Sequence, residues 1–147
     1  MTVTARRMTN ELGARRAALL IITLILAGRA MTVAFIADAG SGVAGDPPAA
    51  WLMPLLGDAV IGLSAFVVAY LILRGRGLSA WTMIVTWNVI GIWDALSAYV
   101  IHVSVPWPEF FMIEVFGASM FFAASAMHLI NLFLVTHREL RNHYLNG

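Results

Sequence analysis

The sequence predicts an all-α integral membrane protein, folded as a bundle of four transmembrane helices with both termini in the cytoplasm. Two observations support this fold class. Hydrophobic residues make up 61% of the chain, a larger share than soluble domains usually carry. Four apolar segments are also long enough to cross a hydrocarbon core of roughly 30 Å, which takes about 20 helical residues. A chain of 147 residues has room for one such bundle, so residues 1–147 are expected to form a single membrane domain.

Segments rich in turn-forming residues separate the four predicted spans. The spans are expected near residues 16–37, 51–73, 79–104 and 111–136. Residues 1–15 are a polar N-terminal segment, and residues 137–147 are a cytoplasmic tail. The first span could instead be a signal peptide, since ADA at 37–39 imitates a cleavage motif. Arg29 favours a membrane helix, because a charge there would interrupt the apolar region of a signal peptide.

The arginines indicate the orientation of the bundle. All basic residues are Arg, and every one except Arg29 lies before or at the start of the first span, between the second and third, or after the fourth. They are Arg6, Arg7, Arg15, Arg16, Arg74, Arg76, Arg138 and Arg141. Because basic residues accumulate in cytoplasmic loops, both termini are predicted to be cytoplasmic, in the inner membrane if the source is bacterial.

Composition also narrows the chemistry. The chain has no Cys, which excludes disulfides, thiol nucleophiles and thiolate metal sites. It has no Lys either, which excludes Schiff-base chemistry. The arginines are scattered rather than gathered on one face, so nucleic acid is not an expected partner. The Glu-x-x-His spacing of a dimetal bundle is absent, and we expect no metal and no cofactor.

Ionisable residues inside the predicted spans are the candidates for a site, because such residues are functional by default. With a helix rise of about 1.5 Å per residue, Arg29, Asp58 and Asp94 fall at similar depths in the outer half of the membrane. His102 and Glu114 lie closer to the outer edge. Asn88, His128 and Asn131 form a deeper group, with His128 roughly 6–12 Å from the two aspartates.

These polar residues share helix faces with small residues. On the second span, Asp58 lies on the same stripe as Gly62 and Ala65; on the third, Asn88 lies with Gly91 and Ala95. Membrane helices pack through small residues and hydrogen-bond through polar ones. The polar side chains are therefore predicted to point into the bundle.

The charges do not balance within the spans. Asp58, Asp94 and Glu114 provide three acids against the single arginine, Arg29. At least one carboxyl group is therefore expected to be protonated or reached by water. A carboxylic acid beside a carboxylate supplies a general acid and a base together. The structural alternatives remain open: an ion pair at Arg29, an interhelical amide bond at Asn88, and a core histidine at His128.

The favoured function is an enzyme that uses this set on a lipophilic small molecule. Asp58 and Asp94 are the predicted acid–base pair, and Arg29 is the charge that gives their carboxyl groups different pKa values. Asn88 is the predicted positioning residue. The chemistry would be epoxide opening by hydrolysis or cyclisation, or isomerisation. The set resembles, in residue types alone, the site of the soluble limonene-epoxide-hydrolase type. The remaining polar and aromatic residues are predicted to line the pocket: Trp51, Trp87, Trp93, Tyr99, His102, Glu114, Phe121, His128 and Asn131.

Two other functions use the same residues. A proton- or cation-coupled transporter or channel would use them as a relay across the membrane, and would be a homo-oligomer because four helices enclose little volume. A structural subunit of a larger complex would use the small-residue faces for partner helices. In each reading membrane lipid is a partner.

Overall fold

The structure is a computed structural model that describes residues 3–37, 49–105 and 115–146. Within these ranges every regular element is helical, so the predicted all-α class is confirmed. Four segments in them are long and apolar enough to cross a membrane. They are Leu12–Phe35, Leu52–Arg74, Gly77–Ser104 and Ser119–Thr136.

The first of these segments changes from α-helix to 3₁₀ helix along its length. The helix α1 (Val3–Leu26) already runs through the predicted polar N-terminal segment, and continues as the 3₁₀ helix η1 (Ala27–Phe35). Side chains three residues apart eclipse in a 3₁₀ helix, which puts Arg29 and Thr32 on one face of η1. The Thr32 hydroxyl lies 2.8 Å from the Arg29 carbonyl oxygen and 3.1 Å from that of Leu55 on the next helix. The 3₁₀ segment thus directs Arg29 toward its neighbours.

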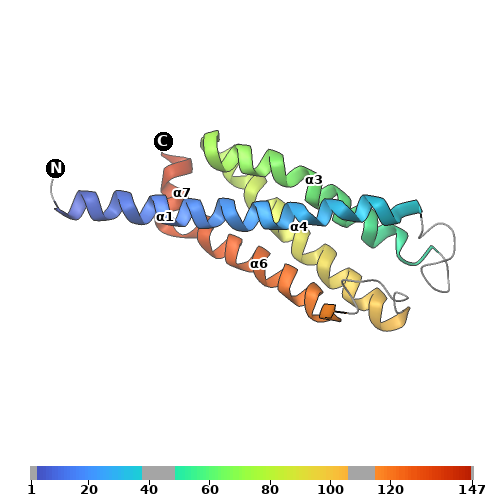
Figure 1. Ribbon diagram of the computed structural model, residues 1–147. Helices are drawn as coiled ribbons and strands as arrows, with labels where there is room; N and C mark the ends of the chain where they lie inside the picture. The colour runs from blue at the N-terminus through green and yellow to red at the C-terminus, as the bar shows by residue number, and fades with distance from the viewer. Residues whose placement is uncertain (1–2, 38–48, 106–114, 147) are drawn as a thin grey trace.

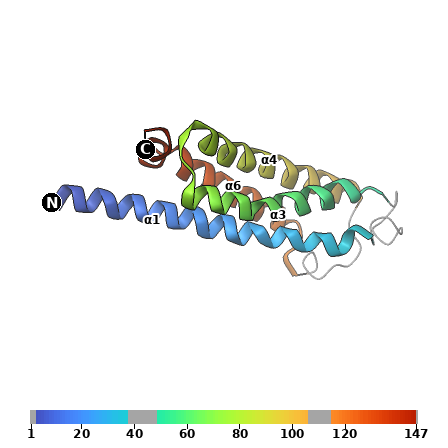
Figure 2. The same cartoon turned by 90° about the horizontal axis from the view of Figure 1, so that it is seen from above.

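The other three long helices complete a ring. They are α3 (Leu52–Arg74), α4 (Gly77–Ser104) and α6 (Ser119–Thr136). Helix α3 lies between α1–η1 and α4, and α6 lies between α4 and α1 (Figure 1). The first turns of α1 extend beyond the other helices, as Figure 2 shows from above. Of the predicted fourth span, residues 111–114 lie outside the described residues.

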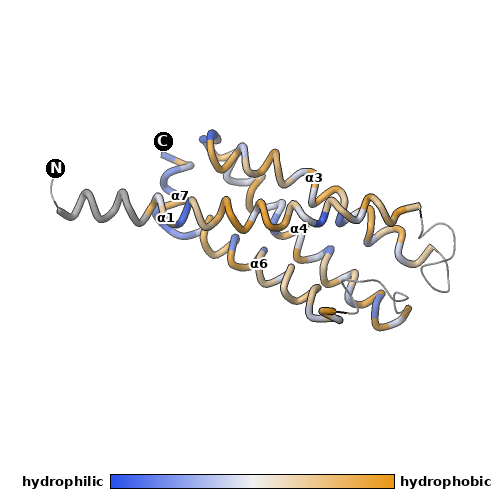
Figure 3. Tube along the Cα trace, viewed as in Figure 1, coloured by the Kyte–Doolittle hydropathy of each residue, from blue (hydrophilic) through white to orange (hydrophobic). Residues whose placement is uncertain are grey.

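Small residues let the helices approach closely. Gly62 and Ala65 of α3 and Ala95 and Ala98 of α4 are buried, and a Cβ at Gly62 would lie 2.0 Å from the backbone nitrogen of Ala30. Other large apolar side chains, such as Phe66 of α3 and Phe133 of α6, point outward and are exposed. The four long helices are mostly hydrophobic along their length, with polar stretches near α7 and in the middle of the bundle (Figure 3). Small residues between the helices and apolar side chains on the outside suit a bundle surrounded by lipid hydrocarbon.

The chain after α6 folds back on the bundle as α7 (Arg138–Leu145). Leu140 and Tyr144, four residues apart on one helix face, are fully buried in the same core cluster as Ile72 and Ile84. The Tyr144 hydroxyl donates to the Ile72 carbonyl at 3.4 Å. The predicted tail is therefore a packed helix with an apolar face.

Arginines from α1 and from the turn between α3 and α4 meet α7 at this end. Arg16 of α1 donates to the Ile72 carbonyl at 2.8 Å, and Arg15 lies 3.4 Å from the Glu139 carboxylate of α7. Arg76 contacts the His143 ring. Burial, together with the charges of Arg76 and Arg16, lowers the pKa of His143 from its ordinary value, so its ring accepts rather than repels the guanidinium.

Replacing Gly62 with alanine is expected to destabilise the fold, because the new Cβ would force η1 and α3 apart. Overpacking of this kind typically costs about 1–3 kcal/mol. The free energy of unfolding in mixed detergent micelles measures the loss. Gly28→Ala, on η1 itself, is the matched control, since a Cβ at Gly28 meets nothing within 4 Å and alanine favours helix. Equal losses at the two positions would contradict close packing at Gly62.

Candidate functional site

Three charged side chains from three elements meet inside the bundle. Arg29 of η1 donates from Nε to Asp58 Oδ1 of α3 at 2.5 Å. Its Nη2 contacts both the Asp58 carboxylate and the Asp94 carboxylate of α4. The side chains of Arg29, Asp58 and Asp94 are only 11%, 20% and 15% exposed. One guanidinium therefore bridges two largely buried carboxyl groups, the set that the sequence predicted to share a site.

The third guanidinium nitrogen reaches a histidine. Arg29 Nη1 lies 3.1 Å from His128 Nε2 of α6, and His128 Nδ1 lies 3.0 Å from Asn88 Oδ1 of α4. The Asn88 amide group donates to the Ile84 carbonyl at 2.8 Å, so its Oδ1 is the atom that faces the ring. Since Oδ1 can only accept, the proton belongs on Nδ1, and Nε2 is left to accept from Arg29. Asn88 and His128 thus form a chain that ends on the guanidinium.

The contact between His128 and the aspartates runs through Arg29. The predicted separation of His128 from the aspartates used helix rise alone, which places backbones and not side-chain ends. The Arg29 side chain extends from η1 toward α6, and Gly91 of α4 leaves room for the His128 ring: a Cβ at Gly91 would lie 2.2 Å from its atoms. His128 therefore joins the charged group directly, whereas Asn88 reaches it only through His128.

A second glycine makes room for an aspartate. A Cβ at Gly57 of α3 would lie 1.8 Å from Asp94 Oδ1. Gly57 directly precedes Asp58 in the chain, so one turn of α3 supplies a carboxylate and the space for another. Gly57 was not predicted to take part, although its position beside Asp58 in an apolar segment was the available signal.

Trp87 connects this group to the surface between α3 and α4. Its ring packs edge-on against the His128 ring, with the centroids 4.9 Å apart. Its Nε1 donates to the Ser64 hydroxyl of α3 at 2.9 Å, and that hydroxyl donates to the Val60 carbonyl at 2.6 Å. Ser64 was not predicted, because a serine hydroxyl that can bond to its own helix gives no sequence signal.

Four other predicted pocket residues form a separate aromatic cluster at the end of the bundle away from α7. Ring centroids lie 6.3 Å apart for Trp51–Phe121, 5.5 Å for His102–Phe121 and 6.3 Å for Tyr99–Phe121. The Trp51 indole also donates to the Val105 carbonyl at 2.9 Å. Glu114 lies outside the described residues.

Asn131 and Trp93 occupy two further places. Asn131 of α6 is fully buried, and its amide group donates to the Thr23 hydroxyl of α1 at 3.3 Å. Its Oδ1 has no hydrogen-bond partner among the residues that the structure describes. Trp93 of α4 is 74% exposed on the outer surface. Asn131 is thus bonded to α1 and not to the arginine or the two aspartates, whereas Trp93 lies on the surface beside Asp94.

An apolar groove between α3 and α4 gives access to the charged group. Its volume is about 510 Å³, and its walls include Met53, Gly57, Trp93, Asp94 and Ser97. Asp94 is therefore both a partner of Arg29 and part of a surface that faces outward from the bundle. Among the described residues, no cluster of three or more His, Cys, Asp or Glu side chains has the arrangement of a metal site.

Arg29→Met is expected to destabilise the protein at neutral pH by about 3–5 kcal/mol, because it leaves two buried carboxyl groups without their counter-charge. Adding Asp58→Asn and Asp94→Asn should restore most of the loss, since neutral amides need no counter-charge. Unfolding in mixed micelles compares the single and triple variants. A triple variant as unstable as Arg29→Met would show that arginine packing, rather than charge, holds the helices.

Comparison with protein families, with curated proteins and with solved structures finds no match to this chain. What the site can do is therefore inferred from its own residues: a guanidinium, two carboxyl groups, and an imidazole held by an amide.

Proposed function

We propose that the protein is a small membrane-embedded enzyme that opens the epoxide of a lipophilic molecule, by hydrolysis or cyclisation, at the Arg29–Asp58–Asp94 group. One observation carries the proposal. Asp94 is bonded to Arg29 in the interior and also lines the apolar groove between α3 and α4. A molecule dissolved in the bilayer could therefore touch an acid whose partners are already in place. Isomerisation by proton transfer would use the same contact.

Charge supports an acid and a base in this site. With both carboxyl groups ionised, the group would carry one net negative charge in surroundings of low dielectric, which is costly. One proton makes it neutral. Asp58 Oδ1 is contacted by both Nε and Nη2 of Arg29, whereas Asp94 is contacted by Nη2 alone. Hydrogen bonds to a carboxylate favour its ionised form, so Asp58 is assigned as the carboxylate and Asp94 as the acid.

Hydrolysis then balances as follows. Asp94 gives its proton to the epoxide oxygen as one ring C–O bond breaks. A water oxygen bonds to the carbon that is released, and Asp58 takes the proton that the water loses. Transfer of that proton from Asp58 to Asp94 restores the starting state. In cyclisation an internal hydroxyl replaces the water. Proton donation and removal of this kind contribute about 10²–10⁴-fold to rate.

His128 and Asn88 are assigned as positioning residues. His128 contacts Arg29 Nη1, the guanidinium nitrogen that neither carboxylate contacts, at 3.1 Å. Asn88 in turn holds the His128 ring at 3.0 Å. Asn88 therefore keeps the role predicted for it, but acts through His128 instead of on the substrate.

A proton-coupled transporter is the second candidate, and Asn131 favours it. Asn131 lies three residues after His128 on α6, so the two share a helix face. Its Oδ1 is buried without a hydrogen-bond partner, and a polar chain could continue there toward the arginine-rich end. Such a carrier would need the same aspartates.

We infer that the four long helices span the membrane with the α7 end in the cytoplasm, because basic residues mark cytoplasmic ends. The chain lacks Cys, so single cysteines can be labelled cleanly in intact cells with a membrane-impermeant maleimide. Cysteine at exposed Ala49, before α3, should react. Cysteine at exposed Asn146, after α7, should react only once the membrane is permeabilised. The reverse pattern would invert the topology.

Asp94→Asn is expected to lower turnover of lipophilic epoxides in proteoliposomes by about 10²–10⁴-fold, because the amide cannot supply the proton. Chromatography of the diol or cyclic product measures the rate for a panel that includes limonene oxide and epoxides of long alkanes. Glu139→Gln makes the same chemical change on α7 and should leave turnover intact. If the wild type converts none of these epoxides, but carries a proton flux that Asp94→Asn abolishes, the transporter is the correct function.

A further inference from the structure

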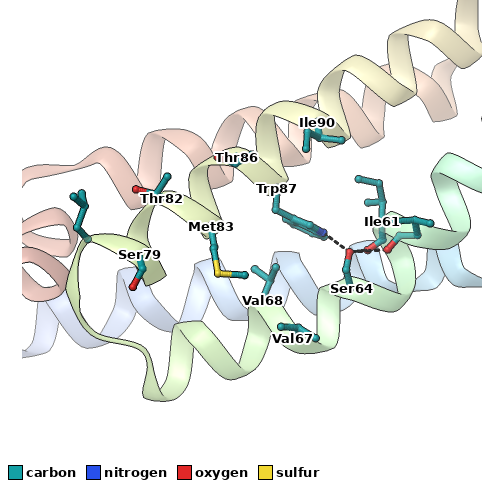
Figure 4. A pocket seen from close by; sticks show the side chains of 12 residues that line it. Ile61, Ser64, Val67, Val68, Ser79, Thr82, Met83, Thr86, Trp87 and Ile90 are labelled. Atoms are coloured by element: carbon teal, nitrogen blue, oxygen red, sulfur yellow. Dashed lines mark hydrogen bonds between the residues drawn. The ribbon is translucent and has the colours of Figure 1, made fainter.

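A second and larger groove lies on the same face of the bundle. Its volume is about 840 Å³, and it also runs between α3 and α4 (Figure 4). It shares Val60, Ile61 and Ile90 with the groove that contains Asp94. The two are therefore one continuous groove with the acid toward one end.

The far part of this groove is suited to an apolar chain. It extends along α4 from Ile90 to Leu78, which is about 18 Å at the rise of an α-helix. None of the described residues that line it is charged. The Trp87 indole N–H beside it is already bonded to Ser64, as Figure 4 shows. A polar headgroup would have no charged partner in this part of the groove, whereas the methylene groups of an apolar chain need none.

The dimensions favour a chain over a helix. A groove of about 840 Å³ that is about 18 Å long has a mean width smaller than that of an α-helix with its side chains, which is about 10–12 Å across. The groove also opens outward, since Val67, Leu78 and Met83 on its walls are each at least half exposed. A flexible chain could enter it sideways from a bilayer.

We propose that the α3/α4 groove binds a lipid with one long apolar chain and an oxygen function at one end, with the oxygen at Asp94 and the chain running toward Leu78. This inference rests on the proposed function, because Asp94 is taken as the reacting end. It narrows the substrate class from any lipophilic epoxide to a terminal epoxide on a long single chain.

Photocrosslinking tests the path of the chain without requiring turnover. The probe is terminally epoxidised hexadecane with a diazirine at the opposite end, added to Asp94→Asn protein in liposomes. Crosslinks mapped by mass spectrometry are expected at Thr82 and Met83, which lie within reach of a sixteen-carbon chain from Asp94, and unlabelled epoxide in excess should suppress them. Crosslinks that spread evenly onto the outer face of α6, or that excess epoxide leaves unchanged, would mean that the groove holds only bulk lipid and would overturn the proposal.

A blocked groove provides the matched control. Thr82→Trp fills the far part of the groove and should reduce crosslinking several-fold, whereas Leu129→Trp on the exposed face of α6 should not. In the wild-type background, Thr82→Trp should lower turnover of the hexadecane epoxide but spare that of a short one. Loss of both alike, or of neither, would contradict a chain in this groove.

Two results separate this inference from the enzyme proposal. Specific crosslinks without any turnover would support the groove and reject the enzyme. Turnover that does not depend on chain length, together with scattered crosslinks, would support the enzyme and reject the groove. A second copy of the chain is the remaining occupant: efficient disulfide-linked dimers of Met83→Cys in membranes, unaffected by the epoxide, would assign the groove to a dimer interface and overturn the proposal.

Discussion

The guanidinium of Arg29 is the interaction on which the centre of this bundle depends. Its three nitrogens contact Asp58 on α3, Asp94 on α4 and His128 on α6, so a single side chain of η1 is bonded to every other long helix. Planar arginine suits this task, because it presents donors in several directions at once. A lysine would offer one compact charge and could not hold the same three partners in a plane. The helices are therefore arranged around a donor as well as around an apolar core.

The small residues follow from this constraint. Hydrogen bonds require heavy atoms near 3 Å, and helices with large side chains between them cannot bring polar groups that close. Gly57, Gly62 and Gly91 stand at the points where a Cβ would overlap a carboxylate, a backbone or an imidazole. Their value lies in the space beside them, since all three sit within ordinary helix. The polar site and the close packing are two aspects of the same arrangement.

The sequence predicted the broad arrangement well, because hydropathy and helix geometry determine it. Four apolar segments, their inward polar faces, and the meeting of Arg29 with Asp58 and Asp94 all follow from spacing along the helices. The contact of His128 with Arg29 was not predicted, since helix rise ignores how far an arginine reaches and how much room Gly91 leaves. Leu140 and Tyr144 stand in a tail whose other residues are mostly polar, so the packing of α7 gave little signal. The groove was beyond prediction, because it depends on how side chains of two helices fail to fill the space between them.

The groove opens to the side of the bundle, and this has a kinetic consequence under the proposed function. A substrate that reaches Asp94 from within the bilayer never crosses an aqueous phase to find the protein. The concentration that governs saturation is then its mole fraction in the lipid, and adding inert lipid at constant total substrate dilutes it in two dimensions. Rates would fall with that dilution even though nothing in the buffer changes, and the protein would respond to the makeup of its membrane rather than to the solution around it.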